Sequence, residues 1–127
     1  MPDKEILVDN WLFKAKEAIV STEKNIEINE LYVAQNRLYY VIFYAVSALA
    51  QKNGFATAKH SQLKGWFNHE FIKTEKFEQK HGKLYFKLFE SRQKSDYTFN
   101  FKPNKEDLLK DLEKVKEFVK IIEKEIE

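Results

Sequence analysis

Apolar residues recur three and four positions apart along most of the chain, which is the spacing of one face of an α-helix. This pattern predicts a first helix over 9–25, with Asp9 as its N-cap. A second helix follows Asn29 and runs to about Asn53, and Gly54 stands where a left-handed terminator is needed. The second half of this helix is apolar almost all round, as expected at the centre of a bundle.

The segments that follow are shorter or more polar. Ser61 can cap a third helix that runs to about Lys73, whereas residues 74–82 are weakly patterned and predict a loop or a short helix. A fourth helix is predicted over 83–96, and Pro103 stops any helix that would run into it.

The last segment is amphipathic. Asn104 caps a fifth helix, and Asp107 stands in its first turn. The predicted core face carries Leu108, Leu112, Val115, Phe118, Val119 and Ile122. The expected fold is all-α: an antiparallel up-and-down bundle of four long helices plus a shorter one, in a single domain over residues 1–127.

Composition supports this fold and removes several classes of function. The chain has 127 residues with 3 Gly and 2 Pro, which disfavours an all-β fold with many tight turns. Because there is no cysteine, disulfides, thiolate metal sites and a cysteine nucleophile are excluded. The 22 basic and 20 acidic residues give a net charge of +2, which is too balanced to predict a nucleic-acid or membrane partner.

The N-terminal residues lack the basic segment and apolar core of a signal peptide, and the apolar stretch 38–50 is too short to span a bilayer. We therefore expect a cytoplasmic protein. The 3 glycines form no phosphate-binding loop, and no two histidines have metal-ligand spacing. The sequence thus predicts neither a cofactor nor a metal site.

Two arginines occupy positions where helical periodicity calls for apolar residues. Arg37 follows Asn36 at the start of an aromatic and aliphatic run, and Arg92 follows Leu88 on one face of the fourth helix. A charge on an apolar face is costly unless a partner or a ligand stabilises it. Arg92 could pair with Asp96 at the surface, and Arg37 could form a structural ion pair inside the bundle. Alternatively, both arginines line one anion-binding cleft, and spacing alone leaves these alternatives open.

Lys59 and His60 precede the predicted start of the third helix. A basic pair beside the free backbone N–H groups of a helix N-terminus suits an anion. A histidine with a purely structural role in the loop explains the sequence equally well. The candidate ligand-binding residues are Asn36, Arg37, Lys59, His60, Arg92 and Asp96.

Several of these segments, in this order, are similar to HEPN domains, a family named after nucleotide binding in higher eukaryotes and prokaryotes. The matching segments are 36–40 with Phe43 and Tyr44, then Gly54, 59–61, Phe67, 71–74, 88–89 and 91–97, followed by a helix that begins near Glu106. The similarity covers the chain from about residue 31 to residue 122. It implies a bundle of four or five helices that commonly dimerises, so a homodimer is expected.

The resemblance also implies a function. Small prokaryotic HEPN proteins are often encoded beside minimal nucleotidyltransferases, in pairs that look like toxin–antitoxin modules. Toxic members are metal-independent ribonucleases in which an arginine is followed, after four to six residues, by a histidine. Arg92 matches that arginine, but Tyr97, Thr98 and Phe99 stand where the histidine is needed. The chain thus resembles the branch of the family in which Asp-Tyr follows the arginine.

Two functions follow from this resemblance. The first is a non-catalytic nucleotide- or RNA-binding partner of a minimal nucleotidyltransferase, with the arginines as its anion site. The alternative is a ribonuclease toxin in which Arg92 stabilises the charge of the phosphorane and His60 or Tyr97 moves the proton. The first is favoured because a tyrosine, with a pKa of about 10, is a poor base at neutral pH.

Overall fold

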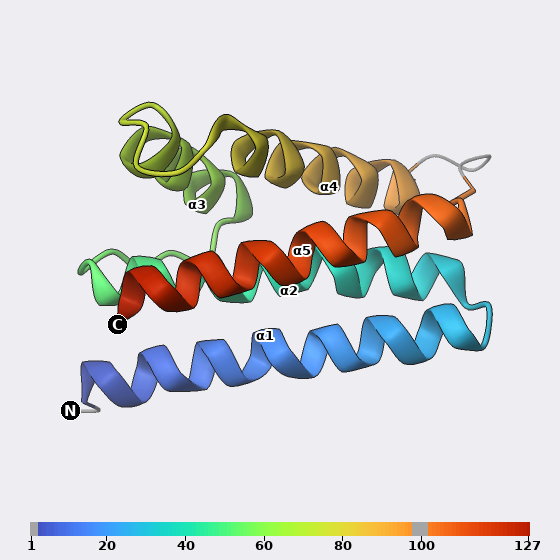
Figure 1. The fold of residues 1–127 in the computed structure, drawn as a ribbon, viewed down its shortest axis with the longest axis horizontal. Coiled ribbons are helices and arrows are strands. Elements are labelled where there is room, and N and C mark those ends of the chain that lie inside the picture. The colour runs from blue at the N-terminus through green and yellow to red at the C-terminus, as the bar shows by residue number, and fades with distance from the viewer. Residues whose placement is uncertain (1–2, 98–101) are drawn as a thin grey trace.

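The computed structural model describes residues 3–97 and 102–127, and the side chains of 95–97 lie outside the description. Its helices are α1 (Lys4–Glu27), α2 (Leu31–Lys52), α3 (His60–Phe67), the π-helical turn η1 (Asn68–Ile72), α4 (Gln79–Tyr97) and α5 (Lys105–Ile126). The long helices run antiparallel in sequence order, and α3 with η1 forms the shorter element (Figure 1). The predicted all-α bundle is confirmed.

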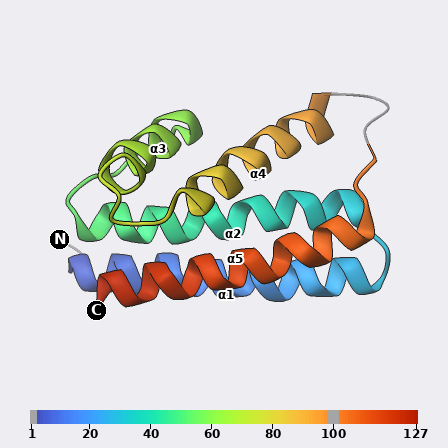
Figure 2. The ribbon, with the colours of Figure 1, turned by 45° about the horizontal axis from the view of Figure 1, so that its top comes forward.

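The second helix, α2, lies at the centre of the bundle. It packs against α1, α3, α4 and α5, and Figure 2 shows it between α4 on one side and α1 with α5 on the other. Residues 45–50 are all buried, which confirms the position expected from their continuous apolar character. Gly54 adopts a φ of 78°, and the N–H of Phe55 donates to the carbonyl of Ala50 at 2.8 Å. The helix therefore ends where the glycine predicts.

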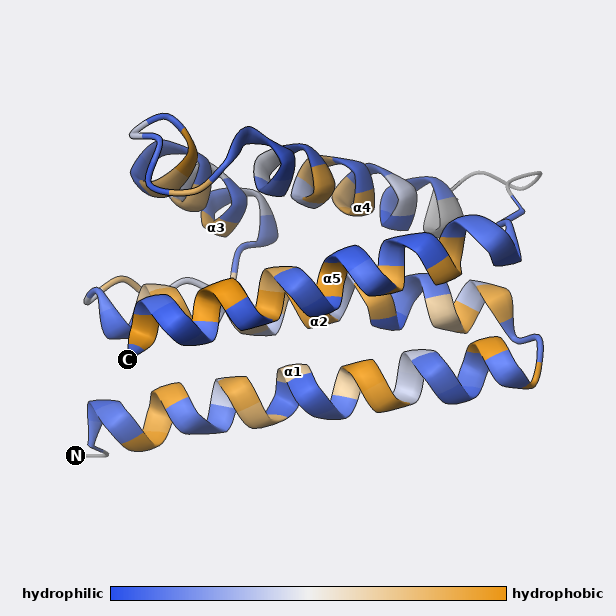
Figure 3. Cartoon of the chain, viewed as in Figure 1, coloured by the Kyte–Doolittle hydropathy of each residue, from blue (hydrophilic) through white to orange (hydrophobic). Residues whose placement is uncertain are grey.

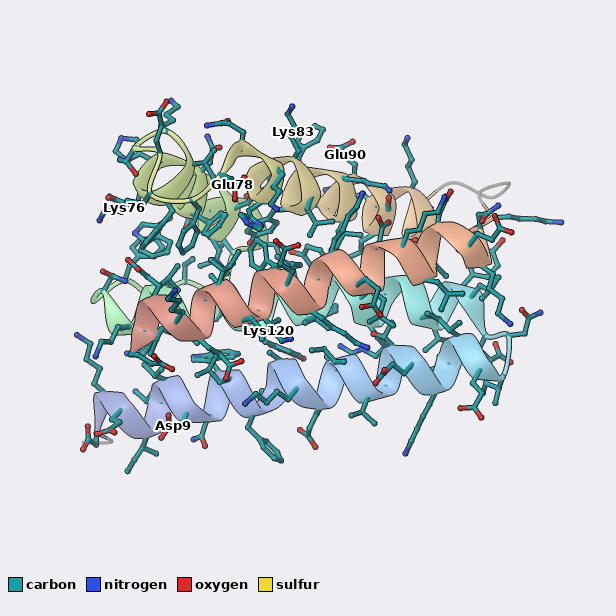
Figure 4. The ribbon with its side chains drawn as sticks, viewed as in Figure 1. Asp9, Lys76, Glu78, Lys83, Glu90 and Lys120 are labelled. Atoms are coloured by element: carbon teal, nitrogen blue, oxygen red, sulfur yellow. The ribbon has the colours of Figure 1, made fainter. Side chains whose placement is uncertain are left out.

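The first helix begins earlier than predicted. α1 starts at Lys4, and a carboxylate oxygen of Asp3 accepts a hydrogen bond from the N–H of Glu5 at 3.0 Å. The predicted cap, Asp9, is wrong, because Asp9 lies inside α1 and projects into solvent (Figure 4). Two physical causes favour the earlier start: Asp3 satisfies a free backbone donor, and Val8 adds a buried contact.

The third helix departs from the prediction at both ends. α3 begins at His60, so Ser61 lies in its first turn and is not the N-cap. The hydroxyl of Thr57 instead accepts a hydrogen bond from the N–H of Lys59 at 3.1 Å, which fixes the chain before the helix. After Phe67 the helix widens into η1 instead of continuing as an α-helix.

The fourth helix also begins earlier, inside the segment predicted to be a loop or a short helix. It starts at Gln79 and buries His81, Leu84 and Leu88 on one face. A close contact with η1 accompanies this start: a Cβ atom at Gly82 would lie 3.1 Å from Cγ1 of Ile72. A side chain at this position would require Ile72 to shift, so the glycine favours the close approach of α4 to η1.

The fifth helix follows its prediction closely. The side chain of Asn104 accepts a hydrogen bond from the N–H of Asp107 at 3.1 Å, which confirms the predicted cap. All six predicted core positions of α5 are buried. Figure 3 shows apolar and polar residues alternating along the helices, as expected of helices with one buried face. Among the described residues, no helix is long and apolar enough to cross a membrane.

Candidate functional site

Arg37 and Arg92 come from different helices, and both contact the ring of Tyr40. Cζ of Arg37, on α2, lies 5.0 Å from the ring centre of Tyr40. Cζ of Arg92, on α4, lies 5.5 Å from the same ring and 5.3 Å from that of Tyr39. These distances are within the range of cation–π attraction, which is about 6 Å. The structure therefore places both arginines where α2 and α4 pack side by side. We call the surface formed by Arg37, Arg92, Tyr39 and Tyr40 the arginine patch.

His60 joins the same patch from the start of α3. Its Nδ1 lies 2.8 Å from the phenolic oxygen of Tyr39, and its ring stacks on that of Phe43 with the centres 4.2 Å apart. The edge of Tyr40 also faces the imidazole, with a centroid distance of 5.7 Å. These contacts attach the start of α3 to α2 beside the two arginines.

Burial acts on the pKa values of two groups in the patch, the imidazole of His60 and the phenol of Tyr39. Burial lowers the pKa of His60, and the positive charge of Arg92 lowers it further. Burial also raises the pKa of the Tyr39 phenol, although Arg92 opposes that effect. The hydrogen bond between them consequently joins a neutral phenol to a neutral imidazole.

This hydrogen bond has two possible directions with different chemistry. If the phenol of Tyr39 donates to Nδ1 of His60, the ring proton sits on Nε2, and the histidine can donate to an anion. If Nδ1 donates instead, Nε2 carries the lone pair and can act as a base. The tautomer of His60 therefore decides whether this residue can donate to a bound anion or accept a proton.

The remaining predicted residues lie around this patch or outside the description. Asn36 is half-buried on α2 next to Arg37, and Lys59 is exposed just before α3. The side chains of Asp96 and Tyr97 lie outside the described residues, and with them the surface pair expected for Arg92. No described residue forms an ion pair with Arg37, and its buried Nε has no hydrogen-bond partner among them. An acceptor on a ligand would offset the penalty of about 1–3 kcal/mol for such a donor.

A cavity of about 570 Å³ adjoins the patch and was missed from the sequence. It is lined by α1, α2 and the segment before α3, and His60 and Phe43 belong to both the cavity and the patch. Trp11 and Phe43 supply aromatic walls, while Ser47 and Gln51 supply polar atoms. The two polar residues on the otherwise apolar end of α2 were the one available signal. A volume of this size is in the range of small-ligand pockets.

The described residues were also searched for a metal-binding site. No group of three or more His, Asp or Glu side chains there is arranged to hold a metal ion. The polar groups of the patch are arginines, tyrosines and one histidine, which suit an anion better than a cation.

Comparison with known proteins decides the family. The family model described as the HEPN domain matches residues 8–126. The chain belongs to the HEPN family. A UPF0332 protein of Thermotoga maritima is 35% identical over 127 residues, which are 100% of this chain and 96% of that protein. A protein of Methanocaldococcus jannaschii that is named as a candidate toxin is 30% identical over 101 residues, which are 79% of this chain and 68% of that protein.

Proposed function

We propose that this HEPN protein is a non-catalytic nucleotide- or RNA-binding partner of a minimal nucleotidyltransferase, in a toxin–antitoxin-like module. The observation that carries the proposal is the convergence of Arg37 and Arg92 on Tyr40, beside His60. Two guanidinium groups on one aromatic patch can hold phosphate oxygens while the rings contact a base. The histidine expected after Arg92 in a ribonuclease is absent from the sequence, which favours binding over cleavage.

The adjoining cavity supplies the second half of a nucleotide site. Phosphate oxygens would lie at the arginines, and the nucleobase would enter the cavity and pack against the aromatic wall that Trp11 and Phe43 form. His60 lies between the arginine patch and the cavity, so an N–H donor at Nε2 could contact the nucleotide's phosphate where it approaches the cavity. Ser47 and Gln51 offer hydrogen-bond partners for the base edges.

Isothermal titration calorimetry with ATP and with a short single-stranded RNA tests the binding site. Arg37→Gln and Arg92→Gln should each weaken binding about tenfold or more, because each removes a charged donor from the phosphate. Lys24→Gln is the matched control, because it removes an exposed positive charge from α1, which contributes no residue to the patch. Equal weakening by all three variants would reduce the effect to overall charge and would contradict the proposal.

The partner is tested separately by genetics and co-purification. A minimal nucleotidyltransferase encoded next to this chain should co-purify with the tagged HEPN protein. The proposed module would be refuted by a gene with no such neighbour, together with the absence of nucleotide binding in the calorimetry.

One observation favours the alternative of a ribonuclease toxin. His60 is neutral and close enough to Arg92 for the arginine to lower its pKa, and one relative is named as a candidate toxin. With Nδ1 donating to Tyr39, His60 could take a proton while Arg92 stabilises the phosphorane. Tyr97 was the other candidate for this role, and its side chain lies outside the described residues.

The alternative predicts cleavage of RNA in the presence of EDTA and arrest of growth on overexpression. Arg92→Ala and His60→Ala should each abolish both effects, whereas Lys24→Ala should leave them unchanged. Undiminished growth and intact RNA with the wild-type protein would exclude the ribonuclease.

A further inference from the structure

A second cavity lies between α4 and α5 and shares no residue with the arginine patch. Its volume is about 370 Å³, which is enough for a small ligand. Four lysines line it, against one glutamate: Lys80, Lys83 and Lys87 from α4, and Lys114 and Glu117 from α5. Leu84 and the imidazole of His81 complete the lining. The site combines an apolar wall with a strongly basic rim.

His81 is the unusual member of this lining. Its side chain is only 3% exposed, and its buried Nε2 has no hydrogen-bond partner among the residues that the structure describes. Its closest aromatic neighbours, Phe77 and Phe118, lie edge-on at 6.4 and 5.8 Å between ring centres and offer no strong acceptor or donor. A buried polar atom in this condition is destabilising by about 1–3 kcal/mol. His81 therefore lies at the wall of the cavity with an unsatisfied polar atom, and a ligand would have to displace the atoms that cover Nε2 to bond to it.

The charges around the cavity are only partly balanced. Nζ of Lys80 lies 2.9 Å from a carboxylate oxygen of Glu117, and Nζ of Lys87 lies 3.0 Å from Asp111. Lys83 and Lys114 form no ion pair within the described part of the chain. Lys83 rises from the outer side of α4, so its charge acts at the rim (Figure 4).

We propose that the cavity between α4 and α5 binds a small organic phosphate, with the phosphate at Lys114, Lys80 and His81 and the apolar part of the ligand against Leu84. A phosphate monoester carries about −1.5 to −2 charges at pH 7, which Lys114 and Lys80 would offset directly and Lys83 would offset from the rim. The ion pair between Lys80 and Glu117 crosses from α4 to α5 beside the cavity. A bound phosphate competes with the carboxylate of Glu117 for Lys80, so Glu117 opposes binding.

The intact protein can be titrated with phenyl phosphate while NMR follows its three histidine side chains at constant ionic strength. The His81 resonances should shift in a saturable way, while those of His69, which is 74% exposed, should stay in place. His60 reports on the arginine patch in the same spectra, so this proposal and the proposed function fail or succeed separately. Inorganic phosphate should bind more weakly, and phenol should cause no saturable shift.

Variants at two exposed residues of the cavity provide effects of opposite sign. Lys114→Gln should weaken phenyl phosphate about three- to tenfold, and Glu117→Gln should tighten it by about threefold because Lys80 is released. Glu113→Gln is the matched control: it removes the same charge from α5 outside the cavity and should leave the affinity within about twofold.

Several results would overturn the proposal. One is an unchanged His81 signal at saturating phenyl phosphate, and another is equal affinity for inorganic and phenyl phosphate. A third is that Glu113→Gln increases the affinity for phenyl phosphate as much as Glu117→Gln does. That result would show an effect of overall charge and not of a specific site.

Discussion

At the scale of single residues, the candidate site depends on one buried tyrosine. Tyr39 is fully buried, carries the guanidinium of Arg92 over its ring and contacts Nδ1 of His60 through its hydroxyl. The ring and the hydroxyl therefore act in different ways: the ring supports the arginine, and the hydroxyl fixes the histidine. The sequence could not identify His60 as the partner of this hydroxyl, because the two residues lie on different helices.

Replacing this hydroxyl tests its structural role. Tyr39→Phe keeps the ring packing but leaves Nδ1 of His60 without its partner, so the free energy of unfolding should fall by about 1–2 kcal/mol. Urea denaturation measures the change. Tyr44→Phe is the matched control, because Tyr44 lies half-buried on the same helix and its hydroxyl has no hydrogen bond among the described residues. The same loss in both variants would show that the bond to His60 contributes nothing.

At the scale of elements, the helices differ in how their glycines are used. Gly54 ends α2 with a φ of 78°, Gly82 lets α4 pack closely on η1, and Gly65 in α3 has open space around it. A glycine inside a helix is destabilising relative to alanine by about 0.5–1 kcal/mol when nothing requires it. The three positions therefore predict three different effects of the same substitution.

Gly65→Ala should stabilise the protein by about 0.5–1 kcal/mol, because the new methyl group meets no atom within 4 Å. Gly54→Ala should destabilise it by about 1 kcal/mol, because the left-handed backbone disfavours a side chain. The Gly82→Ala variant should have a lower free energy of unfolding than the Gly65→Ala variant, because Ile72 must move to admit the methyl group. Thermal and urea denaturation of the three variants rank them, and a stabilising Gly54→Ala would contradict the assignment of the α2 terminus.

Periodicity predicted the helices better than it predicted their ends. The apolar pattern was enough to predict α2, and Asn104 was enough to predict the start of α5, because both signals depend on residues close in sequence. The predicted start of α1 was wrong because Asp3 offers an acceptor further upstream than Asp9. The predicted start of α3 was wrong because this helix begins at His60 without a side-chain cap, so a search for a capping residue could not find it. The early start of α4 depends on contact between Gly82 and η1, which no local pattern contains.

The site shows the same limit. Helical spacing identified Arg37 and Arg92, and the place of His60 before the third helix made it a candidate, yet only the packing of the helices brings the three residues to one patch. His81 gave no signal in the sequence, because its burial against Phe118 follows from the packing of α4 on α5.

At the scale of the whole molecule, the bundle holds two histidines in separate cavities. His60 lies beside the arginine patch, and His81 lies between α4 and α5. Burial is the main cause of a lowered pKa in both, with Arg92 as the further cause for His60 and Lys80 for His81. The carboxylates of Glu117 and Glu78 oppose the effect at His81.

These lowered values predict how the stability depends on pH. Below the ordinary histidine pKa of about 6.5, the unfolded chain binds protons that the folded protein resists. The contribution of both histidines is therefore complete above about pH 6.5 and is lost as the pH falls through the lowered pKa values of the folded state. Urea denaturation at pH 7.5 and pH 5.5 should show lower stability at the acidic pH.

The variant His81→Phe keeps an aromatic ring in the core and should reduce this pH dependence. His69→Gln is the control, because it removes an exposed histidine outside both cavities. A wild-type protein with equal stability at both pH values would contradict the burial of the two imidazoles.

The central claim is that the patch of Arg37, Arg92 and His60 binds nucleotide or RNA phosphate without cleaving it. The most direct measurement is fluorescence anisotropy of an end-labelled single-stranded RNA in EDTA, with the RNA recovered afterwards and its length checked on a gel. The proposed function predicts binding that weakens with salt, that is lost in the Arg37→Gln, Arg92→Gln double variant, and that leaves the RNA full-length. RNA shortened by the wild-type protein but not by Arg92→Ala, or the same affinity in the double variant, would contradict it.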